Sequence, residues 1–154
     1  DQPVTPAFLF AVLLWEPVRQ RYQELLDRGR EPIEAMILAG SEVGTRQQSR
    51  VAIPKRFSLP MREIWEMQPR LEQRQGTRPH RLLGHPRLRA AYDFLLLRAA
   101  AGEADPELAD WWTRFQEGST HERTRMTDTG TKRRRRRRRP KGEAAASVGT
   151  LDGD

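Results

Sequence analysis

Eight consecutive cations near the C-terminus divide this chain into two parts. They are Lys132 and a run of seven arginines that ends before Pro140. Adjacent charges cannot all be buried and they repel one another, so we expect this segment to be solvated and extended. From Gly118 onward the sequence is rich in Gly, Thr, Ser and charge, and has too few apolar residues to form a core. We therefore predict a folded body at residues 1–117 and a disordered basic tail at residues 118–154.

The body is expected to be all-α, because its apolar residues recur at helical spacing and no stretch alternates like a strand. Thr5 before Pro6 and Asp105 before Pro106 are typical helix starts. Gly29, Gly76 and Gly118 are expected to end helices. Pro17 should kink the first helix near Glu16. These signals predict an irregular helical bundle of about five to six helices.

Individual positions carry more specific expectations. A helix over residues 32–48 should bury Ile33, Met36, Ile37 and Val43, and Gly40 and Gly44 should weaken it. A corner is expected at Ile53-Pro54, followed by a helix that Ser58 caps. Trp65 is predicted to pack in the core. Of the adjacent Trp111 and Trp112, one should be core and the other is either core or free to face a partner or stack on RNA.

Composition excludes several classes of site. The chain has no cysteine, so it has neither a disulfide nor a thiolate metal site, which fits a reducing, cytoplasmic location. No apolar run approaches the roughly 20 residues of a membrane span. His80, His85 and His121 have no cysteine or carboxylate cluster beside them. We therefore expect no catalytic and no metal-binding residue in this chain, and its sequence alone leaves open whether it is part of an enzyme.

Positive charge is concentrated in two zones. The net charge of the chain is +7, but residues 46–89 hold eleven Lys or Arg against three Glu, and residues 118–154 hold eleven against five acids. Basic strips of this kind are typical of phosphate binding, and a merely solvated face is the alternative interpretation. The candidate nucleic-acid-binding residues are Arg50, Lys55, Arg56, Arg62, Arg74, Arg78, Arg81 and Arg89 in the body, and Lys132, Arg133, Arg134, Arg135, Arg136, Arg137, Arg138 and Arg139 in the tail.

The body cations fall into two groups. One lies around the Ile53-Pro54 corner and the other around Gly76, where Arg87 also joins. A helix over about residues 59–75 separates them, so they lie either at its two ends or along one groove. The sequence leaves both geometries open.

Four stretches together resemble bacterial poly(A) polymerases, which are relatives of the tRNA CCA-adding enzymes. Ala52-Ile53-Pro54-Lys55-Arg56 resembles a motif of that family. The other matching stretches are Val4–Phe10, Arg74-Gln75-Gly76 with Arg78, and His85–Asp93 with Leu97-Arg98, Trp111-Trp112 and Phe115. The resemblance covers about residues 3–116, and an arginine-rich tail is also typical of the family.

The resemblance implies a parent enzyme that adds AMP from ATP to RNA 3′ ends, a polynucleotide adenylyltransferase of mRNA polyadenylation and RNA decay. Its ATP and Mg²⁺ would be held by a nucleotidyltransferase head with a Gly-Ser turn and two aspartates, and nothing here matches that motif. The chain begins at Asp1 rather than methionine, so we expect a fragment whose head precedes it. The implied partners are RNA 3′ ends, single-stranded or structured, and the head of the same polypeptide.

Two alternatives remain open at this point. The first is a fragment of a CCA-adding enzyme, against which the arginine tail and the Ile53–Arg56 corner argue. The second is a non-enzymatic helical module that binds nucleic acid or a protein partner.

Overall fold

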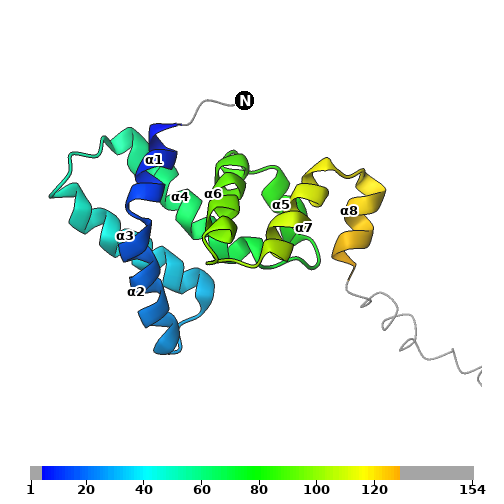
Figure 1. The fold of residues 1–154 in the computed structure, drawn as a ribbon, viewed down its shortest axis with the longest axis horizontal. Coiled ribbons are helices and arrows are strands. Elements are labelled where there is room, and N and C mark those ends of the chain that lie inside the picture. The colour runs from blue at the N-terminus through cyan, green and yellow to red at the C-terminus, as the bar shows by residue number, and fades with distance from the viewer. Residues whose placement is uncertain (1–4, 129–154) are drawn as a thin grey trace, which may run out of the picture.

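The computed structural model describes residues 5–128, and every regular element in that range is a helix. The predicted all-α class is confirmed, but the number of helices is eight rather than five to six (Figure 1). The helices are α1 (Pro6–Leu13), α2 (Trp15–Asp27), α3 (Pro32–Gln48), α4 (Lys55–Leu71), α5 (Arg78–Leu83), α6 (Leu88–Ala100), α7 (Pro106–Glu117) and α8 (Thr120–Thr127).

Local signals set most helix ends as predicted. Thr5 Oγ1 accepts a hydrogen bond from the Phe8 amide at 3.3 Å, and Asp105 Oδ1 accepts one from the Glu107 amide at 2.9 Å. Gly29 ends α2 with φ +86°, a conformation that side chains with a Cβ rarely adopt. Pro17 has no N–H with which to bond the preceding turn. The helix is interrupted at Leu14, which separates α1 from α2.

Helix α4 passes between two halves of the fold, α1–α3 on one side and α5–α7 on the other (Figure 1). It contributes buried residues to the hydrophobic core of each half. Met61, Ile64 and Trp65 pack with α1, α2 and α3. Met67 and Leu71 pack with α5, α6 and α7. The indole Nε1 of Trp65 donates to the Ala11 carbonyl at 3.0 Å, which satisfies the one polar atom of a fully buried side chain.

Two glycines let α3 and α4 approach closely. A Cβ at Gly40 would lie 3.3 Å from Cε3 of Trp65, and one at Gly44 would lie 2.9 Å from Nε of Arg62. The sequence predicted only that these glycines weaken the helix. Their close contacts show that they also make room for two large side chains of α4.

The predicted start of the disordered tail is wrong for residues 119–128. Ser119 and Glu122 form a capping box that opens α8, and Thr127 is buried. The Gly76 amide donates to the Thr127 carbonyl at 3.1 Å, and Arg123 Nε donates to the Phe115 carbonyl at 2.8 Å. The long-range bond to Gly76 and the bond to α7 hold α8 in place although its sequence is polar. The expectation of disorder for residues 129–154 lies outside the described residues.

Two further expectations need correction. Helix α4 begins at Lys55 rather than after Ser58. Ser58 therefore lies inside the helix, and its Oγ accepts a 3.0 Å hydrogen bond from Gln48 of α3 instead of capping the first turn. Met36 and Val43 are buried as predicted, whereas Ile33 is half-buried and Ile37 is exposed. Within residues 5–128 no helix combines the length and apolar character that a membrane crossing requires.

Candidate nucleic-acid interface

The two groups of predicted cations lie at opposite ends of α4. The corner cations, Arg50, Lys55 and Arg56, lie at its N-terminal end, and the turn cations, Arg74, Arg78 and Arg81, follow its C-terminal end. A helix of 17 residues at 1.5 Å per residue separates the groups by about 25 Å. The sequence left open whether the two groups lie at the two ends of this helix or along one groove, and in the structure they lie at its two ends.

The corner cations occupy an unfavourable place in α4. Lys55 and Arg56 lie in its first turn, where the helix dipole repels positive charge, and that turn has no acidic residue. Pro54 precedes the helix without a side-chain cap, so no side chain of the N-cap residue satisfies the backbone N–H groups of the first turn. Arg56 stacks on Phe57 with 4.6 Å between its Cζ and the ring centroid. An anion here would compensate both the dipole and the cations.

These cations are also free of carboxylate partners. Among residues 5–128, no ion pair within 4.0 Å involves Arg50, Lys55 or Arg56, and their side chains are exposed. Buried Ile53 anchors the corner that carries them. The fold thus presents three cations that no acid of the described chain neutralises.

Arg62 differs from the other corner residues. It lies across Gly44, its Nε is buried without a hydrogen-bond partner, and its Nη2 is 3.5 Å from Thr45 Oγ1. It is therefore packed between α3 and α4, and only part of its guanidinium reaches the surface.

Two of the turn cations, Arg78 and Arg81, line a hollow of about 280 Å³ at the end of α4. Its lining residues are Ile33, Arg70, Gln73, Arg78, Arg81 and Leu82. Arg70 was missed among the candidates, although it precedes Arg74 by one helical turn in the basic zone of the sequence. No carboxylate lines this hollow.

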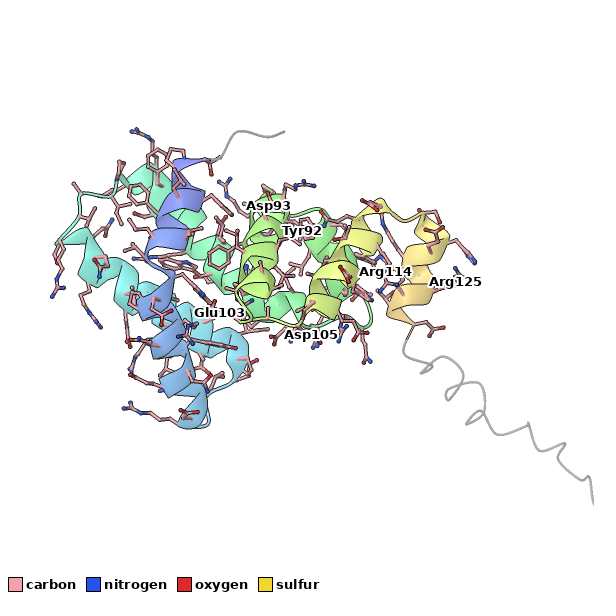
Figure 2. The ribbon with its side chains drawn as sticks, in the orientation of Figure 1. Tyr92, Asp93, Glu103, Asp105, Arg114 and Arg125 are labelled. Carbon is pink, nitrogen blue, oxygen red and sulfur yellow. The ribbon has the colours of Figure 1, made fainter. Side chains whose placement is uncertain are left out.

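Arg89 and Arg87, by contrast, have acidic partners. Arg89 Nε lies 3.5 Å from Asp93 Oδ1 and its Cζ is 5.6 Å from the Tyr92 ring centroid. Arg87 Nε donates to Glu63 Oε2 at 3.1 Å. Figure 2 shows Tyr92 and Asp93 together on α6. Both arginines have part of their charge neutralised within the fold.

The tryptophans are not available for base stacking. Trp65 is fully buried, which confirms the prediction that it packs in the core. Trp111 and Trp112 are 8% and 0% exposed, so the interpretation of one of them as a partner-facing or RNA-stacking residue is wrong. The Trp112 indole donates to the Leu71 carbonyl at 2.7 Å, and Trp111 stacks on Phe115 with ring centroids 4.7 Å apart.

The histidines have local structural partners. His80 Nε2 is 2.9 Å from Thr127 Oγ1, and His85 Nδ1 accepts the Arg87 amide at 3.0 Å. In residues 5–128 no three His, Asp or Glu side chains come together in a group that could hold a metal ion. The donor set of this part of the chain does not fit a magnesium centre, so we derive no reaction step through one.

One arginine that the sequence did not single out is deeply packed. Arg98 Nη1 donates to Gln68 Oε1 at 3.0 Å, and its Cζ lies 5.4 Å from the ring centroid of Trp15. Burial lowers the pKa of Arg98, and its Nε is buried without a hydrogen-bond partner. Arg98 therefore packs between the two halves of the fold and is not a candidate for binding a ligand at the surface.

A second hollow, of about 540 Å³, lies between α7 and α8. Its lining residues are Arg114, Glu117, Gly118, Glu122, Arg125 and Met126, and Figure 2 shows Arg114 and Arg125 at this end of the molecule. Two carboxylates balance its two arginines, so it lacks the one-sided charge of the first hollow.

The chain matches known proteins over most of its length. A family model described as the arginine-rich C-terminus of polymerase A matches residues 28–143. Poly(A) polymerase I of Escherichia coli O6:H1 is 39% identical over 130 residues, which cover 82% of this chain and 28% of that protein. Poly(A) polymerase I of Salmonella typhi matches to the same extent, and that of Haemophilus influenzae is 36% identical over 125 residues, which cover 80% of this chain and 28% of that protein. The chain thus spans about 28% of the length of these relatives.

Proposed function

The chain belongs to the family of polymerase A arginine-rich C-termini, and from that premise we propose that it is the RNA-binding portion of a poly(A) polymerase. The parent enzyme would add AMP units from ATP to RNA 3′ ends. In this proposal the chain itself binds the RNA and orients its 3′ region, while ATP and Mg²⁺ are used by the catalytic head of the same polypeptide.

The observation that carries the proposal is the set of unneutralised cations at both ends of α4. Arg50, Lys55 and Arg56 lie at one end, and the turn cations lie about 25 Å away at the other. A small anion cannot contact both groups at once, whereas an extended polyanion can. Guanidinium groups form paired hydrogen bonds with phosphate oxygens, so RNA backbone is the partner that these cations fit.

The tail would add affinity rather than selectivity. Lys132 and the seven arginines after it can neutralise phosphates and release condensed counterions, and this term does not depend on base sequence. Positive charge also accelerates encounter with RNA. The body would then decide where the bound RNA lies.

An exposed apolar stripe on α1 supports a place for the catalytic head. Leu9, Val12 and Leu13 are 58%, 41% and 71% exposed, and their spacing of three and four residues sets them on one face of the helix. The relatives are more than three times as long as the matched region, so further polypeptide is available to cover this face. We assign it to the head, because a contiguous exposed apolar face is typical of an interface.

A variant of the parent protein tests this assignment. Replacing Leu9 and Leu13 with serine should lower its thermal stability and its rate of AMP addition, while the isolated chain keeps its helicity. Leu97→Ser, which changes an exposed leucine on α6, is the matched control. Unchanged stability and activity in the double variant would contradict the assignment of the α1 face to an interface with the head.

Poly(A) synthesis is preferred here to tRNA repair, because the matched family and the relatives named above are poly(A) polymerases. We also propose a cytoplasmic location, because the proposed reaction would draw on the ATP and RNA of the cytoplasm.

Two measurements test the proposed function. The chain should bind single-stranded RNA with an affinity that falls steeply as salt rises, as measured by fluorescence anisotropy. The parent protein should extend RNA 3′ ends with ATP. It should not restore the CCA end of a tRNA that lacks it. Failure of the chain to bind RNA, or salt-independent binding, would contradict the proposal.

A further inference from the structure

The hollow at the C-terminal end of α4 has the size and the walls of a binding site for one small molecule. It measures about 280 Å³ and lies where the start of α3, the end of α4 and helix α5 meet. This volume lies just below the lower end, about 300 Å³, of typical small-molecule sites, so the hollow has room for at most one nucleotide-sized ligand. We call it the arginine hollow.

Charge makes the arginine hollow selective for anions. Arg70, Arg78 and Arg81 line it, and none of the three forms an ion pair within the described part of the chain. Three guanidinium groups without a carboxylate among the lining residues favour an anionic ligand.

The remaining walls fit a flat heterocycle. Ile33 and Leu82 contribute apolar surface, and the side-chain amide of Gln73 makes no hydrogen bond to another residue in the range 5–128. A ligand for this hollow must combine a negative group, a flat apolar body and an edge that both donates and accepts hydrogen bonds. A nucleotide has these three parts together.

We propose that the arginine hollow binds one adenosine monophosphate unit. Its phosphate lies against Arg78, Arg81 and Arg70, its base lies between Ile33 and Leu82, and Gln73 contacts the base edge. The Gln73 carbonyl accepts from the adenine N6 amino group while its amide donates to N7, the pairing that glutamine makes with adenine. The proposal rests on the proposed function, since the product of a poly(A) polymerase supplies a chain of such units.

Binding of short RNAs of one base type to the 154-residue chain tests the site. Fluorescence anisotropy at about 200 mM salt, where non-specific phosphate binding is weakened, should show tighter binding of oligo(A) than of oligo(C) or oligo(U) by about fivefold or more. Gln73→Ala should abolish that preference and leave oligo(C) binding unchanged. Gln75→Ala, an exposed neighbour outside the hollow, is the matched control and should keep the preference.

The phosphate contacts have a separate readout. Replacing both Arg78 and Arg81 with alanine should reduce the slope of log K against log salt by up to about 0.7, because both arginines contact the same phosphate and one phosphate contact to a single strand contributes about 0.7. In the matched control, Arg19 and Arg21 are both replaced with alanine, which removes the same amount of positive charge. These two arginines are already paired with glutamates on the surface. The control should leave the slope nearly unchanged.

Competition distinguishes the two sources of an adenylate. Displacement of oligo(A) by free AMP would show that the hollow accepts the nucleotide itself, and binding of oligo(A) without such displacement would assign it to the RNA chain. Equal binding of all RNAs by the unaltered chain, or a preference for oligo(A) that survives Gln73→Ala, would overturn the adenylate site while leaving RNA binding intact. Absence of any RNA binding would overturn both.

Discussion

Arg98 donates a 3.0 Å hydrogen bond from Nη1 to Oε1 of Gln68, and this bond joins the two halves of the fold. Gln68 is 2% exposed on α4, next to Met67 of the second core and one helical turn after Ile64 of the first. Its Nε2 also donates to the Ala91 carbonyl of α6 at 3.2 Å. One amide thus accepts a hydrogen bond from a partly buried cation and donates one to a carbonyl of the same neighbouring helix.

Removal of that amide should destabilise the fold. In Gln68→Ala the Arg98 guanidinium and the Ala91 carbonyl each lose one hydrogen bond in the interior, which we expect to cost about 2–3 kcal/mol of unfolding free energy. Urea denaturation monitored by circular dichroism measures the loss. Gln68→Met keeps the volume without the hydrogen bonds and should lose a similar amount. A methionine variant as stable as the unaltered chain would show that the amide contributes only volume.

The two glycines of α3 should respond differently to alanine. A Cβ at Gly40 would lie 3.3 Å from the fully buried ring of Trp65, which its hydrogen bond to the Ala11 carbonyl holds in place, so we expect Gly40→Ala to cost about 1–3 kcal/mol. A Cβ at Gly44 meets the guanidinium of Arg62, which can turn into solvent. Alanine also favours the helix over glycine by about 1 kcal/mol, so Gly44→Ala should be neutral or stabilising. Thermal unfolding of the two variants checks the contrast, and an equal loss in both would contradict it.

Replacing Lys55 and Arg56 with alanine should separate binding from stability. The slope of log K for single-stranded RNA against log salt should fall by about 1.4 with the loss of two phosphate contacts. The melting temperature should stay the same or rise, because two cations leave the positive end of the helix dipole. Parallel loss of RNA affinity and of helicity would instead assign these residues to the fold.

Neutralising the arginine run tests the accessory role of the tail. With Lys132 and the seven arginines replaced by glutamine in the full chain, the salt slope should fall by at most about 6, since eight single-strand contacts at 0.7 each set the upper limit. A neutralised full chain is better than a truncation after residue 117, because that cut would remove α8 with its bonds to Gly76 and Phe115. Equal slopes in the two proteins would exclude the run from binding.

Glu66 should make stability depend on pH. Partial burial on α4 raises the pKa of its carboxyl, with the nearby Arg70 acting in the opposite direction. The folded state therefore binds the proton more tightly than the unfolded state, so this contribution to stability is present in acid and is lost as pH rises through the raised pKa. Glu66→Gln should be more stable than the unaltered chain near pH 7, by no more than about 0.5 kcal/mol because solvent screens the half-exposed group. The advantage should vanish near pH 4, and a destabilised Gln variant near pH 7 would contradict this reasoning.

Local sequence signals predicted the helices well where the cause was local. Thr5-Pro6, Pro32 and Asp105-Pro106 each begin a helix because caps and prolines act on the first turn alone. Two errors had a common origin in distant partners. Ser58 looked like a cap but bonds to Gln48, and the polar segment of α8 looked disordered but is held by Gly76 and by contacts with α7.

The sequence by itself determined that the body is helical, where most helices begin, and that positive charge collects in two zones. These properties follow from nearest neighbours along the chain and from composition. Only the tertiary structure decided that the corner and turn cations lie at opposite ends of α4, that Arg89 is paired with Asp93, and that Arg70 joins Arg78 around a hollow. Pairing, burial and cavities depend on residues far apart in sequence, and packing alone sets which of them meet.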